Sequence, residues 1–298
     1  MFSQSFPFFN HYWPFLLIGF IFYVLGNVFA KSSKVVRHTK QIFKQSYEDS
    51  TSLEKELEEE TELEQDELDD EFVPALPSDL QHIPFVYTRP SPEQLVQRTQ
   101  EFYELVAARR SIRSFSSDPV SKDIIREIIK AAGTAPSGAH TEPWTFVLVS
   151  DVQIKAQIRE IVEREEEVNY KRRMGKQWTT DLKPLRTNWI KEYLTTAPYL
   201  ILVFKQMYGL TESGERKNHY YHDISVAIAC GILITAIQAA GLVTVVSTPL
   251  NGGPSIRKIL NRPANEKLVL VFPVGYPASD ATMPDLHRKH LSEILVEF

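Results

Sequence analysis

The chain has 298 residues, 43% of them apolar, which is enough for a substantial core and excludes a fully disordered protein. Its one cysteine, Cys230, excludes a disulfide framework and any zinc or iron–sulfur site built from several cysteines. The net charge is −5: residues 54–71, with 12 acids and one lysine, contribute −11, and the remaining residues contribute +6. This mildly basic remainder suits a binder of anionic cofactors. It is far from the dense basic surface of a nucleic-acid-binding protein.

The first 30 residues contain no Lys, Arg, Asp or Glu, and the 18 residues from 13 to 30 are almost wholly apolar. A helix of that length spans about 27 Å, close to the hydrocarbon thickness of a membrane. A cleaved signal peptide fits less well because no basic segment precedes the run, and a core helix fits less well because the run has no polar face. We therefore expect a single-pass membrane anchor over residues 1–30. Because basic residues follow this run and none precede it, we expect the C-terminal bulk of the chain to lie in the cytoplasm.

Residues 31–83 are predicted to form a charged, acidic tether, because the acidic block repels itself and has no aromatic residue before Phe72. A solvated spacer is the simplest interpretation, and a specific docking role is the alternative. The folded domain is expected over residues 84–298. Its first helix is expected to begin at Ser91, an N-cap followed by Pro92, and to continue to about Ala108.

Helices and apolar strands then alternate irregularly along the domain. Helices are expected over residues 121–132, 152–174, 184–194, 223–240 and 254–260, and strands over residues 144–149, 199–204, 242–247 and 268–274. This order predicts an α+β domain of three layers, with a central mixed sheet flanked by helices. The helix over 223–240 is apolar on nearly every side, so we expect it in a large core or at a dimer interface. Cys230 lies within it and is expected to be an inert, buried thiol.

A basic cluster follows the first predicted helix and is the first candidate for chemistry. It consists of Arg109, Arg110, Ser111 and Arg113. Guanidinium groups match phosphate oxygens in charge and in geometry. The alternative is a solvated basic helix end, which the helix dipole also favours.

The loop over residues 134–144 is the second candidate, because its small residues around Gly138 allow the backbone to approach a planar ligand closely. An ordinary connection between a helix and a strand is the alternative. The loop contains neither the phosphate-binding-loop motif nor the dinucleotide-binding glycine motif. The eight histidines show no metal-ligand spacing, so no metal site is predicted.

Glu166, Tyr170 and Lys191 form the third candidate. Glu166 and Tyr170 are four residues apart on one predicted helix face, and Lys191 is assigned to the next predicted helix. A carboxylate, a phenol and an ammonium brought together could hold a zwitterion by both of its charges. The alternative is that all three are exposed helix residues. Sequence position alone does not choose among Glu163, Glu165, Glu166 and Glu167.

Taken together, these motifs resemble the nitroreductase superfamily, whose flavin-binding opening is similar to residues 109–113 and 135–144. More narrowly, residues 90–298 resemble the iodotyrosine deiodinase branch of that superfamily. The matching segments are residues 133–144, 166–170, 187–193, 225–231, 248–251 and 275–284. The chain departs from that pattern at Gly252, where Cys is expected, and at Val246 and Ser247, where Thr residues are expected; these are small changes.

The resemblance implies a nitroreductase-like homodimer that binds FMN at the subunit interface, with each site using both subunits. The residues expected to bind FMN are Arg109, Arg110, Ser111, Arg113, Ser137, Val246, Ser247, Thr248 and Arg288. Thr248 is expected to hydrogen-bond flavin N5, which favours one-electron chemistry. The Ala139 N–H is expected to meet the phenolate oxygen of the substrate. Thr248 and Ala139 are thus the expected catalytic groups.

The implied reaction is the FMN-dependent reductive dehalogenation of mono- and diiodotyrosine to tyrosine and iodide, which salvages iodide. NADPH is the implied ultimate reductant, directly or through a separate reductase partner. Glu166 would bind the substrate ammonium, whereas Lys191 and Tyr170 would bind its carboxylate. Substrate binding would order the Glu166 helix and the Lys191 helix into a lid that excludes water from the flavin. One alternative is a generic membrane-tethered FMN nitroreductase or quinone reductase. Another is a tethered binding protein without turnover.

Overall fold

The structure is a computed structural model in which residues 74–211 and 214–298 are described. The predicted anchor and the acidic block of the predicted tether lie outside these residues. In chain order the elements are α2 (Pro92–Ala107), α3 (Lys122–Ala132), η2 (Gly138–His140), β1 (Trp144–Val149), α4 (Val152–Val168), η3 (Asn169–Arg173), α5 (Lys176–Leu182), η4 (Lys183–Leu185), α6 (Tyr193–Thr196), β2 (Tyr199–Gln206), β3 (Tyr208–Leu210), β4 (Arg216–Asn218), α7 (His222–Ala239), β5 (Val243–Thr244), α8 (Gly253–Ile259), β6 (Glu266–Gly275) and η5 (Leu291–Glu293), where η marks a 3₁₀- or π-helical turn.

The central sheet has four strands in the order β1-β2-β6-β5. These strands pair antiparallel, and a parallel bridge between Ser111 and Thr244 makes the sheet mixed. This bridge fixes the segment that carries the basic cluster to β5, the strand at one edge of the sheet. The Ile112 N–H donates to the Thr244 carbonyl at 3.1 Å in the same contact.

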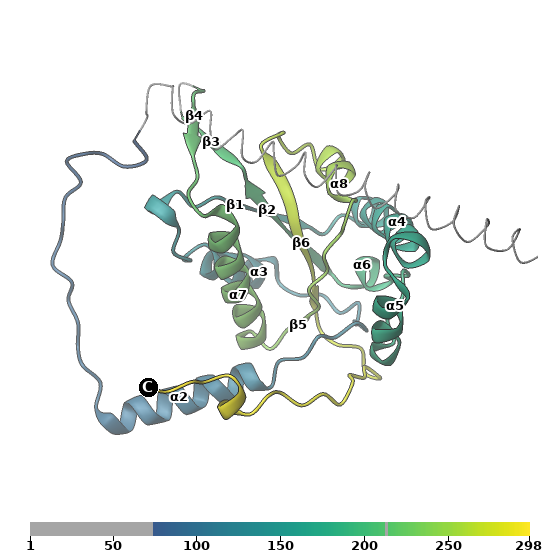
Figure 1. Ribbon diagram of the computed structural model, residues 1–298, viewed down its shortest axis with the longest axis horizontal. Coiled ribbons are helices and arrows are strands. Elements are labelled where there is room, and N and C mark those ends of the chain that lie inside the picture. The colour runs from purple at the N-terminus through teal and green to yellow at the C-terminus, as the bar shows by residue number, and fades with distance from the viewer. Residues whose placement is uncertain (1–73, 212–213) are drawn as a thin grey trace, which may run out of the picture. The chain divides into compact units, whose positions relative to one another are not determined.

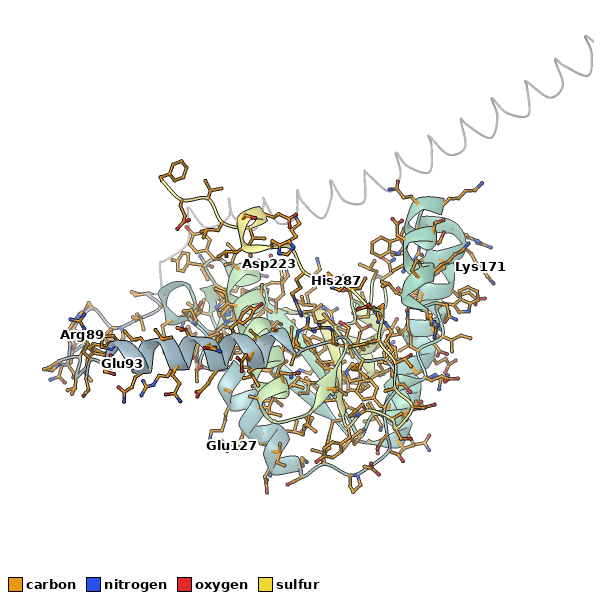
Figure 2. All side chains as sticks on the ribbon, turned by 90° about the horizontal axis from the view of Figure 1, so that it is seen from below. Arg89, Glu93, Glu127, Lys171, Asp223 and His287 are labelled. Carbon is orange, nitrogen blue, oxygen red and sulfur yellow. The ribbon has the colours of Figure 1, made fainter. Side chains whose placement is uncertain are left out.

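Helices cover both faces of the sheet, which confirms the predicted three-layer α+β arrangement (Figure 1). Side chains alternate along β2, so Leu200 and Leu202 pack on one face whereas Ile201 and Val203 pack on the other. The first face lies against α4, α6 and α8, and the second lies against α3 and α7. Charged side chains at the periphery, such as Lys171, point away from these layers (Figure 2).

The predicted helix over 184–194 is wrong. Only its first residues form a short turn, η4, and its last residues form α6, whereas residues 186–192 have neither helix nor strand. Two local features interrupt it. Arg186 adopts a left-handed conformation with φ 49°, and the Asn188 side chain accepts the Ile190 N–H at 2.8 Å, a turn that competes with helical hydrogen bonding. Lys191 therefore lies in an irregular segment and not on a helix.

Two further predictions change in detail. The strand predicted over 242–247 is limited to β5, followed by a bridge between Ser247 and Val271. The helix predicted over 152–174 is α4 continued by the π-helical turn η3, a geometry often found at functional sites. The hairpin of β3 and β4 was not predicted. The other predicted helices and strands are confirmed within two residues.

Among the described helices, α7 is the one that is long and apolar enough to cross a membrane, and a core helix passes the same test. Its buried side packs on β2 and α3, and burial raises the pKa of Cys230 to about 11, as expected for an inert thiol. Ile224 and Ile228 nevertheless leave 62% and 41% of their surface exposed. This helix therefore has one face in the core and one apolar face open.

Candidate active site

The basic cluster and Arg288 meet at the C-terminal end of α2. Arg110 donates to the Ala107 carbonyl at 2.6 Å, and Arg288 donates to the carbonyls of Ala107 and Arg109 at 3.0 Å each. The last carbonyls of a helix have no hydrogen-bond donor within the helix, and here guanidinium groups donate to them. This local need explains why an arginine near the C-terminus lies beside a cluster near residue 110.

These arginines line one cavity of about 350 Å³. Its lining residues are Arg109, Arg110, Ser111, Arg113, Leu185, Met283, Pro284, Leu286, His287 and Arg288. No carboxylate stands among them. Burial, together with repulsion from Arg288 and Arg110, lowers the pKa of Arg109. Partly buried like charges favour the binding of an anion, which relieves their repulsion.

The loop before β1 is held in an unusual backbone conformation. Ala139, His140 and Glu142 all have positive φ values, between 47° and 54°, which non-glycine residues adopt at a cost. The Ser137 hydroxyl accepts the Glu142 N–H at 2.9 Å and so closes the loop. Such strain persists where neighbouring contacts fix the chain, and it points to a functional loop. Ser137 is half-buried and Ala139 is exposed.

Close packing explains the glycine of this loop. A Cβ atom on Gly138 would lie 2.8 Å from the Cβ and carbonyl oxygen of Tyr220. Only glycine lets the two backbones approach this closely. The loop that carries Ala139 is therefore pressed against the segment that leads into α7.

Glu166, Tyr170 and Lys191 come together, as the family resemblance implies. The Lys191 Nζ lies 3.7 Å from Glu166 Oε2 and 5.7 Å from the centre of the Tyr170 ring. The lysine and glutamate side chains are only 8% and 13% exposed. Burial lowers the pKa of Lys191, and this effect outweighs the opposing one of Glu166. Burial likewise raises the pKa of Tyr170, although nearby Thr187 acts in the opposite direction.

The four glutamates that sequence position could not separate have different partners. Glu166 is the one that pairs with the Lys191 ammonium. Glu163, Glu165 and Glu167 pair with Arg159, Arg173 and Lys171, respectively. The α4 helix thus presents one carboxylate to the ammonium and neutralises the others with cations nearby.

Arg113 joins the basic cavity to this polar group. Its charge acts on the pKa values of Tyr170, Lys191 and Tyr193, which places it within electrostatic reach of all three. Tyr193 is buried, and burial raises its pKa to about 12, although nearby Ser247 acts in the opposite direction. The cavity that Arg113 lines therefore lies near the group formed by Glu166, Tyr170 and Lys191.

The segment after β5 borders the same site. Val246 and Thr248 are exposed there, and Ser247 is half-buried. Asn251 lies at φ 63° with its Nδ2 3.5 Å from Asn169 Oδ1, and buried Asn169 donates to Glu166 Oε1 at 3.2 Å. This link connects the segment that carries Thr248 to Glu166.

Sequence reasoning missed Asn169 and Tyr193. Asn169 stands beside the matched glutamates and Tyr193 ends a matched segment, but nothing in their spacing shows that they are buried polar groups. Asn169 donates to Glu166, three residues before it, and Tyr193 has Ser247 of a distant segment close enough to affect its pKa. Only the folded arrangement identifies their roles.

Comparison with known proteins adds independent findings. Residues 106–276 match the model of the Nitroreductase family. Iodotyrosine deiodinase 1 of Mus musculus is 61% identical over 217 residues, covering 73% of this chain and 76% of the mouse protein. Iodotyrosine deiodinase 1 of Homo sapiens is 58% identical over 217 residues, covering 73% of this chain and 75% of the human protein. A crystal structure of oxidized iodotyrosine deiodinase bound to FMN and 3-iodo-L-tyrosine is 31% identical with a TM-score of 0.57, covering 66% of this chain and 98% of that one.

Proposed function

The chain belongs to the nitroreductase family and, within it, to the iodotyrosine deiodinases, and from this premise we propose how its residues carry out FMN-dependent deiodination of mono- and diiodotyrosine. The observation that carries the proposal is the buried pairing of Glu166 with Lys191 beside a cavity lined by arginines. A zwitterionic ligand needs the first feature, and a phosphate-bearing cofactor needs the second.

The basic cavity fits FMN by the chemistry of its donors. Arg109, Arg110, Ser111, Arg113 and Arg288 supply guanidinium and hydroxyl donors, and no carboxylate in the lining opposes a phosphate. Reduced FMN, when bound, would supply two electrons, which with a proton replace one carbon–iodine bond by a carbon–hydrogen bond and release iodide. The relief of repulsion around Arg109 would favour the phosphate further.

The flavin ring would be held by residues outside the arginine-lined cavity. We assign its contacts to Ser137 from the strained loop and to Val246, Ser247 and Thr248 from the segment after β5. The Thr248 hydroxyl would hold flavin N5. The bridge between Ser247 and Val271, with backbone hydrogen bonds of 3.0 and 2.9 Å, ties this segment to the sheet and so gives a planar ring a fixed edge.

The substrate would bind by both of its charges. Glu166 takes its ammonium, and Lys191 and Tyr170 take its carboxylate. The Ala139 N–H donates to the phenolate oxygen and so orients the iodinated ring. Glu166 lies at the end of α4, and Tyr170 lies in η3, which continues it. Substrate binding would fix this region as a lid that keeps water out.

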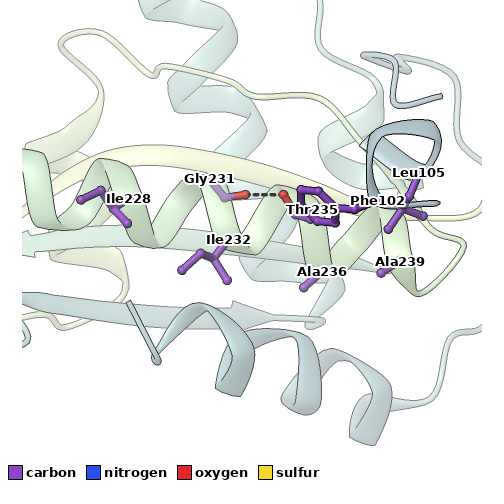
Figure 3. A pocket seen from close by; sticks show the side chains of 8 residues that line it. All are labelled: Phe102, Leu105, Ile228, Gly231, Ile232, Thr235, Ala236 and Ala239. Carbon is purple, nitrogen blue, oxygen red and sulfur yellow. Dashed lines mark hydrogen bonds between the residues drawn. The ribbon is translucent and has the colours of Figure 1, made fainter. Parts of the chain in front are cut away.

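A homodimer accounts for the apolar face of α7. A groove of about 500 Å³ lies between α2 and α7, and Figure 3 shows its lining. Its residues are Phe102, Leu105, Ile228, Gly231, Ile232, Thr235, Ala236 and Ala239. Thr235 turns its hydroxyl to the Gly231 carbonyl at 2.9 Å, so even this polar side chain leaves the groove apolar. A second copy would cover the surface, and each FMN site would then use both subunits.

The membrane anchor and the electron source are proposed from the sequence. Residues 1–30 would hold the catalytic domain at the cytoplasmic face of a membrane. NADPH would be the ultimate reductant, acting directly or through a reductase.

The decisive experiment mixes the full chain, FMN-loaded and reduced by dithionite, with diiodotyrosine and measures released iodide. With dithionite in excess, two iodides and one tyrosine are expected for each diiodotyrosine. A generic nitroreductase would instead reduce a nitroarene and leave diiodotyrosine intact, and a binding protein would release no iodide. Either of these results would contradict the proposal.

A further inference from the structure

Glu163 lies one helical turn before Glu166 on α4 and contacts the backbone of Lys191. Its Oε1 atom accepts the Lys191 N–H at 2.6 Å and also the Arg159 Nε–H at 2.7 Å. Both are charge-assisted hydrogen bonds to one carboxylate oxygen, a class stronger than neutral hydrogen bonds. Arg159 of α4 therefore fixes the Glu163 carboxylate, and the carboxylate in turn fixes the 186–192 segment through the Lys191 N–H.

Further contacts continue along the same face of α4. Arg159 donates to the Thr195 hydroxyl at 3.0 Å, and buried Lys155 donates to the carbonyls of Thr195 and Ala197 at 3.2 and 2.8 Å. Lys155, Arg159 and Glu163 are spaced four residues apart, so all three face the chain that runs from Lys191 into β2. Together they fasten this chain to α4.

The fastening matters because residues 186–192 have no helix or strand to hold them. The position of the Lys191 ammonium then depends on how its backbone is fixed. That ammonium also donates to the Asn188 carbonyl, a contact within the same irregular segment. Glu163 supplies the contact to Lys191 itself from a regular element.

We propose that Glu163 is a positioning residue for substrate recognition, which sets the distance between the Lys191 ammonium and the Glu166 carboxylate without touching the substrate. The inference rests on the proposed function. Because Glu163 and Glu166 belong to one helix turn, a single rigid element fixes both ends of the zwitterion site. Without Glu163, the ordering of the Lys191 segment would be left to the substrate, at the expense of affinity.

The test uses the full chain in detergent, loaded with FMN, with calorimetric titration of diiodotyrosine. Glu163→Ala is expected to weaken diiodotyrosine affinity about tenfold. Glu163→Gln keeps an oxygen that can accept the Lys191 N–H and should recover most of the affinity. Glu160→Ala, an exposed glutamate three residues earlier on α4, is the matched control and should bind like the wild type.

A second readout separates positioning from loss of structure. The ratio of kcat/KM for diiodotyrosine to that for 2-iodophenol, which has no zwitterion, should fall by the same factor in Glu163→Ala. A general loss of fold would lower both rates together and leave the ratio unchanged, which would overturn the inference, as would wild-type affinity in Glu163→Ala. Failure of the wild type itself to bind diiodotyrosine would overturn the proposed function instead.

Discussion

Lys191 and Glu166 face each other across 3.7 Å, and both side chains are almost withdrawn from solvent. A buried ion pair loses hydration that its mutual attraction only partly restores. A zwitterion can exchange with this pair, since its ammonium takes the carboxylate and its carboxylate takes the ammonium. A ligand with a single charge would leave one of the two protein charges buried without a partner. In the proposed function, the pair would therefore select for an amino acid as substrate.

Glu166→Gln tests this selection. The amide keeps the shape but loses the charge, so diiodotyrosine affinity should fall by about 10- to 150-fold, the worth of a charge-assisted hydrogen bond of roughly 1.5–3 kcal/mol. FMN content should stay intact. The measurement is the ratio of diiodotyrosine to 2-iodophenol turnover, with Glu167→Gln as control, since Glu167 pairs with Lys171 on the exposed side. Equal ratios in wild type and Glu166→Gln would remove Glu166 from the substrate site.

Thr248→Ala tests the proposed contact with flavin N5. The variant should retain FMN and diiodotyrosine affinity but release iodide at least about tenfold more slowly, because one hydrogen bond is worth about 1.5 kcal/mol. Thr248→Ser restores the hydroxyl and should recover the rate, measured as iodide release after reduction by dithionite. A Thr248→Ala rate equal to that of the wild type would show that this hydroxyl has no part in the chemistry.

Arg109→Ala tests the phosphate site. Loss of a charge-assisted contact to phosphate should weaken FMN affinity by roughly 1.5–3 kcal/mol in a fluorescence titration. Arg126→Ala is the control, because Arg126 lies on the exposed side of α3 and pairs only with Asp123 among the described residues. Unchanged FMN affinity in Arg109→Ala would exclude Arg109 from the phosphate site. Arg110→Ala should be measured alongside, since Arg110 lines the same cavity and can compensate in part.

The sequence predicts those parts of the site that depend on local order. Arg109 to Arg113 could be found because the arginines are adjacent, and the long apolar run of α7 marks it as a helix. Arg288 could be placed only by resemblance, since its contacts with Ala107 and Arg109 join distant parts of the chain. The segment at Lys191 is predicted to be helical but is irregular, because the left-handed conformation of Arg186 and the turn at Asn188 have no signature in its residue spacing.

The choice of Glu166 among neighbouring glutamates also required the structure. Successive positions point in different directions around a helix, so each glutamate meets a different cation. Which direction faces Lys191 depends on how α4 packs on the sheet. The resemblance to relatives selected Glu166, and the ion pair with Lys191 agrees with that selection.

His219 predicts a pH dependence of stability that is separate from the active site. Its Nε2 lies 3.2 Å from Gln206 Oε1, and its Nδ1 is buried without a hydrogen-bond partner among the described residues. Burial, with nearby Lys217 and His222, lowers its pKa from 6.5 to about 4. Between pH 6.5 and about 4, this histidine is therefore protonated in the unfolded chain but neutral in the folded chain. Its contribution to stability is full above this pH range and is lost as the pH falls through it.

His219→Gln removes this titration and keeps an amide that can reach Gln206. Urea unfolding at pH 7 and at pH 4.5 should show a smaller loss of stability for His219→Gln than for the wild type. His290→Gln, an exposed histidine near the C-terminus, is the control and should keep the wild-type loss. Equal losses in all three proteins would mean that His219 does not control the acid sensitivity.

Ile228→Glu tests the homodimer. Ile228 lies in the apolar groove between α2 and α7, and 41% of its surface is exposed in the single chain. A dimer would bury this surface, so a carboxylate placed there would have to lose its hydration without a partner, which costs several kcal/mol. Ile124→Glu is the matched control, because Ile124 on α3 is 42% exposed and lies outside the groove. Sedimentation of the full chain in density-matched detergent should give a monomer for Ile228→Glu and dimers for the wild type and Ile124→Glu.

The same variant separates the dimer from the cofactor site. If each FMN site uses both subunits, Ile228→Glu should lose FMN although it leaves every residue of the arginine-lined cavity in place. Thermal unfolding of the FMN-free proteins gives the reference, since Ile228→Glu and Ile124→Glu should then differ only by the stability of the dimer. A monomeric Ile228→Glu that keeps its full FMN content would show that one subunit completes the site. A dimeric Ile228→Glu would show that the groove of α2 and α7 is not the interface.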